Sequence, residues 1–370
     1  MRRLLGITAA ALLMSAALPS FEAEPARLFI KNATIVPVAG ARLDGGGILV
    51  ENGKIKAVGK EIQAPADAKV IDASGMFVYP GFIDSYSHFG LVEIAAIAGT
   101  SDFREMGKEN PELRVVWAIN PHSVHFGTGR VTGTTTALVA PAGGTFAGIS
   151  ALVKMDGWTV PEMTFKEAAT SFINFPMTPR PVGEGIAVQS EAKEDVTSKL
   201  VDKIRDYLKE ARRYLELKKL AAGDPGVKAP EYSARYEALG PVLDGTLPVI
   251  ISVEKAKDIE LAIKFVQDEK LKAVFRGCAQ GFKVADKIKQ SGIPVIIDSL
   301  YAGPSEPEDG YDAPYRNVVE LAKAGVLISF STEIMTGSVP SSASPKASYL
   351  ALYWGALTPG SAAASFLSSR

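Results

Sequence analysis

Hydrophobic and polar positions divide the chain into three zones with different patterns. Residues 4–18 form one unbroken apolar run, rich in Ala and Leu. Residues 28–79 carry short strand-like runs separated by turn signals, and from residue 80 to 336 short apolar runs alternate with longer helical patterns. The zones predict a leader segment, a small β domain and a larger α/β domain.

The first zone predicts a signal peptide over residues 1–23. Arg2 and Arg3 precede the apolar run, and Pro19 and Ser20 end it. The run is shorter than the ~20 residues that a membrane-spanning helix needs. We therefore expect a protein exported across the inner membrane, in its simplest form periplasmic, without a stable membrane anchor.

The second zone, residues 24–79, predicts a small β domain. Its strand-like stretches cover residues 28–38, 47–59 and 69–79. Asn52 and Gly53, between apolar runs, are typical of a tight two-residue hairpin turn. We expect a small antiparallel sheet that must pack against another layer to be stable.

The third zone, residues 80–357, predicts an α/β domain. Eight short apolar runs stand at residues 77–84, 135–141, 149–154, 171–177, 248–254, 272–277, 294–300 and 326–332. Helical patterns lie over residues 196–219, 256–269, 281–290 and 315–324. Eight strands with intervening helices over this length predict a (β/α)8 TIM-like barrel. Residues 358–370 read as an irregular tail.

Charge and rare residues narrow the chemistry. The 370 residues hold 40 Lys and Arg against 41 Asp and Glu, so the chain lacks the electrostatic footprint of a nucleic-acid-binding protein. The single cysteine, Cys278, excludes a disulfide framework and cysteine-based zinc sites. Of the three histidines, His122 and His125 are three residues apart at the start of a predicted helix, where we expect a structural or solvated role.

Several short motifs carry a family resemblance. Residues 70–84 read VIDASGMFVYPGFID, residues 133–136 GTTT and residues 151–157 ALVKMDG. In order and spacing the chain resembles the imidazolonepropionase-like branch of the amidohydrolase superfamily over about residues 28–357. The resemblance implies a barrel beside a small β-sandwich. It also implies hydrolysis of non-peptide C–N bonds, as in cyclic amides, by water activated on a divalent metal (Zn, Mn or Fe).

The same resemblance implies ligand positions on the first strand of the barrel. The family places two histidines one residue apart there, because residues i and i+2 point the same way on a strand. Here His88 keeps the second position, whereas Tyr86 replaces the first histidine.

The later ligand positions also depart from the family. Ser252 or Glu254 stands where the fifth strand would offer a histidine, and Arg276 where the sixth would. Glu333 stands where the eighth strand would carry the catalytic aspartate, so it keeps the carboxylate. A guanidinium cannot ligate a metal.

Two accounts of this site remain open. In one, His88, Tyr86, Glu254 and Glu333 hold a hard ion such as Mn²⁺ or Mg²⁺. In the other, which we favour, metal binding is weak or absent and Arg276 neutralises Glu254 and Glu333. Arg276 and Ser252 are then candidates for binding a small-molecule ligand.

The C-terminal sequence adds a further departure. The strands that complete the β-sandwich in the family have no counterpart after residue 357, so the sandwich is predicted to be incomplete, with an open edge. Either a partner chain or a second copy covers this edge, or the product is truncated. Three functions therefore stay open: a metal-dependent hydrolase, a catalytically inactive binding or partner subunit, and a truncated gene product.

Overall fold

The computed structural model describes residues 27–38, 40–178, 190–298, 300 and 303–332, with the side chains of 190–195 left aside. The chain divides into two compact units, Met1–Pro80 and Gly81–Arg370, which we describe separately. The predicted signal peptide, the tail over 358–370 and Glu333 lie outside the described residues. Within the described ranges, no helix has both the length and the apolar character needed to cross a membrane.

The first unit is a five-stranded sheet. Its strands are β1 (Arg27–Ile35), β2 (Leu43–Glu51), β3 (Lys54–Gly59), β4 (Lys69–Asp72) and β5 (Phe77–Val78). The order is β3-β2-β1-β4, and β5 also pairs with β1. The prediction of an antiparallel sheet was partly wrong, because β4 and β5 run parallel to β1. The connection 60–68 carries the chain from β3 past two strands before it pairs again.

The turn between β2 and β3 confirms the predicted hairpin. Asn52 and Gly53 both have positive φ, 51° and 72°, as a two-residue turn that follows the twist of the strands requires. Ile35 and Ile48 are at the centre of the small apolar core of this unit. The described residues of the unit hold a single sheet, so the second layer of a sandwich stays a prediction.

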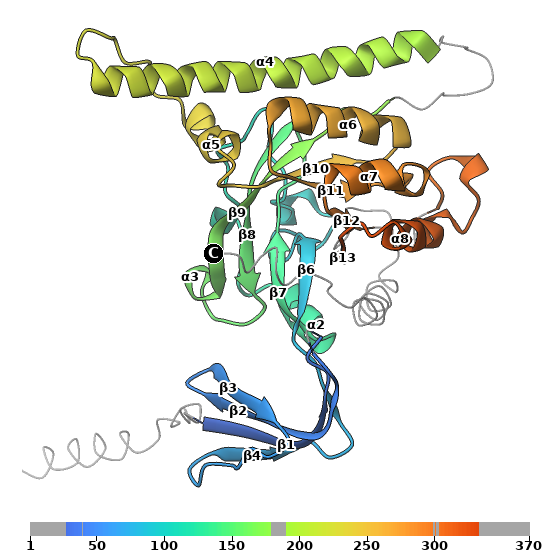
Figure 1. Ribbon diagram of the computed structural model, residues 1–370. Helices are drawn as coiled ribbons and strands as arrows, with labels where there is room; N and C mark the ends of the chain where they lie inside the picture. Colours follow the sequence, from blue (N-terminus) through green and yellow to red (C-terminus); the bar gives the residue numbers. More distant parts are fainter. Residues whose placement is uncertain (1–26, 39, 179–189, 299, 301–302, 333–370) are drawn as a thin grey trace, which may run out of the picture. The chain divides into compact units, whose positions relative to one another are not determined.

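The second unit is built on an eight-stranded sheet (Figure 1). Its strands are β6 (Phe82–Ser87), β7 (Thr134–Val139), β8 (Phe146–Lys154), β9 (Thr164–Asn174), β10 (Val249–Val253), β11 (Ala273–Gly277), β12 (Val295–Ile297) and β13 (Ile328–Phe330). They follow one another in sequence order across the sheet. Each predicted run corresponds to one of these strands, which confirms the eight-stranded TIM-like architecture.

The strand directions correct that prediction in one place. β8 runs antiparallel to both β7 and β9, whereas the other neighbours are parallel. The connections 140–145 and 155–163 are shorter than the dozen or more residues that a parallel crossover needs. The second of them holds only the one-turn helix α3 (Val160–Met163). The barrel therefore lacks regular β/α units between β7 and β9.

The longer helices belong mainly to the later part of the unit. They are α2 (Val124–Val131), α4 (Ser190–Gly223), α5 (Ala234–Leu243), α6 (Ala256–Glu269), α7 (Ala285–Ser291) and α8 (Ala313–Lys323). Single 3₁₀ turns are η1 (Ala98–Thr100), η2 (Val115–Trp117), η3 (Gly281–Lys283) and η4 (Pro307–Asp309). The four predicted helical stretches correspond to α4, α6, α7 and α8. His122 precedes α2 instead of lying within it, because the side chain of Ser123 caps the helix.

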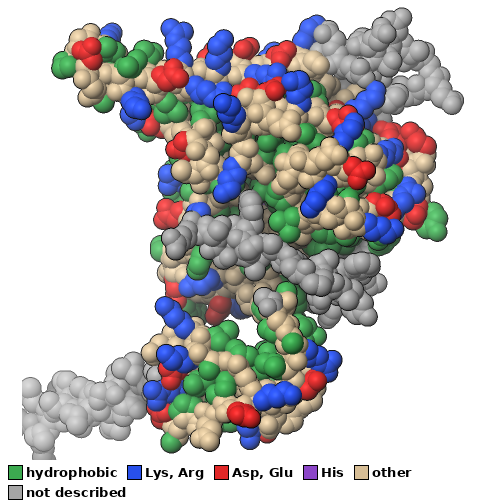
Figure 2. Space-filling view, in the orientation of Figure 1, with side chains coloured by type: hydrophobic (Ala, Val, Ile, Leu, Met, Phe, Trp, Pro, Cys, Tyr) green, Lys and Arg blue, Asp and Glu red, His purple; other side chains and the backbone are tan. Residues whose placement is uncertain are grey.

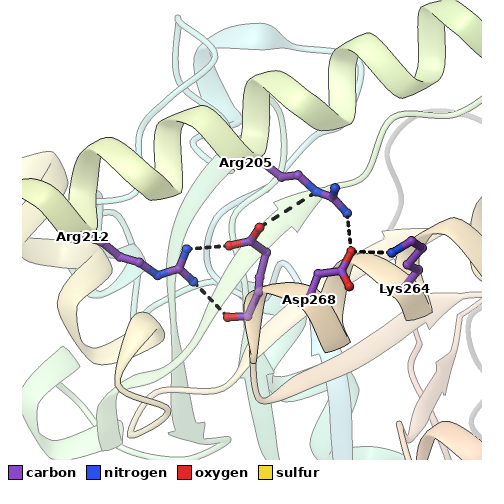
Figure 3. A network of polar contacts seen from close by, with 5 residues as sticks. Arg205, Arg212, Lys264 and Asp268 are labelled. Atoms are coloured by element: carbon purple, nitrogen blue, oxygen red, sulfur yellow. Dashed lines mark hydrogen bonds and ion pairs between the residues drawn. The ribbon is translucent and has the colours of Figure 1, made fainter.

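Helix α4 is held against the barrel by a narrow apolar stripe and an ionic clip. Ile204 and Leu208 are buried in the main core. Arg212 donates to the Glu269 carboxylate at 2.6 Å and to its carbonyl at 2.9 Å, and Arg205 pairs with Asp268 at 3.0 Å (Figure 3). Lys and Arg alternate with Asp and Glu on the outer surface of this helix (Figure 2). This pattern agrees with the predicted solvated outer helix.

A separate apolar cluster fills the interior of the barrel. On β10, Val249 and Ile251 pack in the main core with the outer helices, whereas Ile250 points to the opposite side of the sheet. Ile250 packs there with residues from β6 to β12, among them Tyr86 and Phe172. Tyr86 is therefore an interior residue of the barrel.

A carboxylate joins the two ends of the sheet. Asp84, on β6, accepts hydrogen bonds from the backbone N–H of Thr332 at 3.2 Å and from the hydroxyl of the same residue. It also accepts from the backbone N–H of Tyr86 at 3.2 Å. Thr332 lies two residues after the end of β13, so the Asp84 side chain ties β6 to the segment that follows β13.

Candidate functional site at the barrel mouth

The parallel strands bring polar side chains to one end of the barrel. His88 follows β6, Glu254 follows β10, and Asp298 follows β12, while Arg276 lies one residue before the end of β11. In barrels of this kind the loops after the strand C-termini form the active site. We therefore take this end, here called the mouth, as the candidate site.

His88 is buried and held in one tautomer. Its Nδ1 lies 2.8 Å from the carbonyl oxygen of Ala140, which can only accept, so Nδ1 carries the proton. Nε2 then has a lone pair and lies 3.4 Å from the hydroxyl of Tyr86. Burial, together with the positive charge of Arg276, lowers the pKa of His88 to about 4, although the hydrogen bond to Ala140 opposes this shift. The imidazole is therefore neutral at pH 7.

Arg276 lies between an aromatic ring and a carboxylate. Its guanidinium carbon is 3.8 Å from the centroid of the Tyr86 ring, a cation–π contact. Its Nη2 is 2.8 Å from a carboxylate oxygen of Asp298, and the two side chains are only 11% and 9% exposed. The positive charge is thus fixed in place and largely shielded from water.

Ser252, in β10, and Glu254, directly after β10, lie beside the neighbouring strand β11, which carries Arg276. The Glu254 carboxylate accepts from the backbone N–H of Ala279 at 3.2 Å. It also lies against Gly277, where an added Cβ would meet the carboxylate oxygen at 2.1 Å, so a side chain there would displace it. Ser252 is half-buried and stands directly opposite Arg276 in the strand register. Both residues therefore lie next to Arg276 along the mouth.

The remaining sequence candidates belong elsewhere. Cys278 is fully buried, and burial raises the pKa of its thiol well above the usual value, which fits a core residue. His125 places Nε2 3.1 Å from the carbonyl oxygen of Glu93, and His122 is exposed. These contacts agree with the structural and solvated roles expected for the two histidines.

The described mouth does not fit a divalent metal. The described part of the chain contains no group of three or more His, Cys, Asp or Glu side chains arranged to hold an ion. His88 offers a single nitrogen, and the Tyr86 hydroxyl already lies beside it. A fixed guanidinium next to these groups repels a cation by about 4 kcal/mol per unit charge at 4 Å.

Asp298 is the residue that sequence reasoning missed. The structure describes an ion pair between Arg276 and Asp298, and the expected neutralisation of Glu254 and Glu333 by Arg276 stays a prediction. The signal was present, since Asp298 ends the apolar run PVII of a predicted strand. An Asp or Glu that directly follows a predicted buried strand is a candidate mouth residue, even at a position where the family has no ligand.

Comparison with solved structures identifies the fold. An amidohydrolase from Thermotoga maritima MSB8 matches with a TM-score of 0.73 and 23% identity, covering 89% of this chain and 84% of that one. No protein-family model matches the sequence.

Comparison with curated proteins finds local likeness. A 5-methylthioadenosine/S-adenosylhomocysteine deaminase from Pyrococcus furiosus is 41% identical over 71 residues, 19% of this chain and 17% of the deaminase. A dihydroorotase from Geotalea daltonii is 43% identical over 61 residues, 16% of this chain and 14% of the enzyme. The chain thus matches less than a fifth of the length of either relative.

Together the comparisons show the fold of an amidohydrolase and a local sequence likeness to a deaminase and a dihydroorotase. The structural likeness extends over most of the chain, and the sequence likeness is confined to short stretches.

Proposed function

We propose that this chain is an amidohydrolase-like hydrolase of non-peptide C–N bonds, of the imidazolonepropionase-like branch, with an impaired metal centre. The fold shared with an amidohydrolase supports the general assignment. The local likeness to a dihydroorotase and a deaminase supports substrates with a cyclic amide or an amino-substituted ring. The mouth supplies the reason for the impairment.

The observation that carries this proposal is the position of Arg276 between Tyr86 and Asp298. Its guanidinium N–H groups and the Ser252 hydroxyl are hydrogen-bond donors that suit the carbonyl or carboxylate oxygen of a ligand. The neutral His88 can accept a proton at Nε2, because its Nδ1–H is held by Ala140. The described residues thus support binding and orientation of a polar ring, and we route no step through a metal.

The buried ion pair also favours a second function, that of a catalytically inactive binding subunit. A guanidinium already paired with a carboxylate offers less positive charge to a developing oxyanion than an unpaired one. The scaffold would then hold a small ligand without turning it over. Fold alone does not separate the two functions.

Metal content and hydrolysis, measured on the same sample, separate them. The protein is purified without chelator and offered Zn²⁺, Mn²⁺ or Fe²⁺ in turn. It is then assayed on a dihydropyrimidine, a hydantoin and an aminopurine. We expect substoichiometric metal and slow hydrolysis, by ring opening of the cyclic amides or deamination of the aminopurine, that His88→Gln reduces. Stoichiometric metal with fast turnover contradicts the impairment, and a folded protein without turnover on any ring supports the binding subunit.

A further inference from the structure

Arg276 and Asp298 form a buried pair in the mouth. Arg276 belongs to β11 and Asp298 follows the neighbouring β12, so two adjacent strands bring the charges together. Both side chains are about nine-tenths buried, and their polar atoms meet at 2.8 Å. A guanidinium remains charged at any pH that a folded protein meets. The mouth therefore holds a permanent positive charge with its own counter-ion.

The surroundings of the pair fix the guanidinium from a second direction. The Tyr86 ring, from β6 on the other side of the barrel interior, lies 3.8 Å below it. The same tyrosine places its hydroxyl 3.4 Å from Nε2 of His88, the nitrogen that would face a metal ion. One aromatic side chain thus connects the cation to the only imidazole among the mouth residues named above.

We infer that Arg276, positioned by Asp298 and the Tyr86 ring, is the resident cation of the mouth, so that a divalent ion and Arg276 exclude one another. The inference rests on the proposed function in placing the ancestral ion near His88. It deepens that proposal by assigning Asp298 as the positioning residue and by giving the cause of the impairment. In the absence of Arg276, the mouth keeps His88, Tyr86, Asp298 and Glu254, none of which carries a positive charge at pH 7 that would repel a cation.

Metal uptake by Arg276 variants tests this exclusion. Wild type, Arg276→Gln and Arg276→Lys are incubated with Mn²⁺ or Zn²⁺ and desalted, and bound ions per chain are counted by elemental analysis. We expect Arg276→Gln to bind one ion at least about tenfold more tightly than wild type, because a repelling charge is gone. Arg276→Lys keeps the charge and should stay close to wild type. Stoichiometric uptake by the wild type, or none by a folded Arg276→Gln, overturns the inference.

Two further variants separate a change in metal uptake from a general loss of folding. Arg276→Gln with Asp298→Asn replaces the ion pair by a neutral pair of similar shape, and we expect it to fold but to lose the uptake gained by Arg276→Gln. Uptake equal to that of Arg276→Gln contradicts a role for Asp298. Arg130→Gln removes the partner of Asp156 in an exposed pair of the same unit and should leave uptake unchanged.

These measurements do not depend on turnover. The hydrolysis assay tests the proposed function. The number of bound ions per chain and the rise in melting temperature with added metal test only whether Arg276 excludes a divalent ion. A wild type without turnover whose Arg276→Gln variant binds metal supports the inference and contradicts the hydrolase. A wild type that turns over substrate with stoichiometric metal contradicts the inference.

Discussion

The two halves of the eight-stranded sheet are built by different rules. From β10 to β13 every neighbouring pair of strands is parallel, and α6, α7 and α8 connect them in turn (Figure 1). From β6 to β9 the sheet contains the antiparallel β8 and no regular crossover helix between β7 and β9. Irregular chain covers this half instead: residues 108–115 pair with β8 through bridges at Phe146 and Ile149.

The same division runs through the mouth. The early half contributes a neutral imidazole and aromatic rings, and the rings of His88 and Phe103 lie 4.9 Å apart between centroids with an interplanar angle of 34°. The later half contributes the charges of Glu254, Arg276 and Asp298. We call the side chains of His88, Tyr86 and Phe103 the neutral wall of the mouth, and those of Glu254, Arg276 and Asp298 the charged wall. The cation–π contact between Tyr86 and Arg276 joins the two walls. The predictions below test each wall and its supports.

Removing one member of the charged wall should have the largest effect. Asp298→Ala leaves the buried guanidinium of Arg276 without the carboxylate at 2.8 Å. Breaking a buried pair in this way costs about 3–5 kcal/mol in the free energy of unfolding. Urea denaturation measures it, with Asp156→Ala as the control, because Asp156 is 85% exposed in its own ion pair. Equal losses in the two variants contradict a special role for the mouth pair.

Changes in pH should act in opposite directions on the stability contributed by His88 and by Asp84, two buried residues at or next to β6. The pKa of His88 falls from 6.5 to about 4, mainly by burial, so the unfolded chain binds more protons between these values and stability falls as pH drops from 6.5 to 4. The pKa of Asp84 rises from 3.8 to about 6, also by burial, so the folded chain binds more protons there and stability falls as pH rises from 4 to 6.

Each shift corresponds to about 3 kcal/mol, so the two effects should nearly cancel in the wild type. Chemical denaturation at pH 4, 5, 6 and 7 tests this on single variants. His88→Gln should become less stable as pH rises from 4 to 6, and Asp84→Asn more stable. If stability changes with pH in the same direction in both variants, the opposite pKa shifts of His88 and Asp84 are contradicted.

A glycine in the irregular cover should matter less. Gly148 has φ +129°, and an added Cβ would lie 2.7 Å from the carbonyl oxygen of Leu113. Gly148→Ala should therefore cost about 2 kcal/mol through backbone strain and loss of the close approach. Gly127→Ala is the matched control, since it lies in α2 with nothing within 4 Å of the new Cβ. Thermal unfolding of both should show a loss only for Gly148→Ala.

The smallest expected loss of stability comes from the ionic contacts between α4 and the end of α6. Arg212→Ala removes contacts to the side chain and carbonyl of Glu269, but the arginine is 36% exposed. We expect a loss of about 1 kcal/mol, reduced by salt. Arg213→Ala, an exposed neighbour on the same helix, should change stability by less than half as much. Denaturation at low and high salt measures both, and a salt-independent loss contradicts an ionic clip.

The sequence predicted the later half of the barrel better than the early half. Runs such as 248–254 and helix 256–269 reappear as β10 and α6, because buried parallel strands and amphipathic helices leave strong local patterns. The direction of β8 depends on loop length and on pairing with distant residues, which a local pattern does not record. At the mouth, the side chains at 86, 88 and 276 were identified from the family pattern. The partner of Arg276 was not, because Asp298 lies outside that pattern.

The tie between Asp84 and Thr332 has a consequence for how this domain forms. It joins residues 248 positions apart, so it closes a loop that includes all the remaining barrel strands, β7 to β13. Closing so long a loop carries an entropy cost that is repaid only once the intervening strands have assembled. On the ribosome, β6 emerges first among the barrel strands, and Asp84 lacks its partner Thr332 until the residues after β13 have been synthesised. The tie between the two ends of the sheet therefore forms late in folding, and nascent chains that lack the residues after β13 leave the Asp84 carboxylate without this partner.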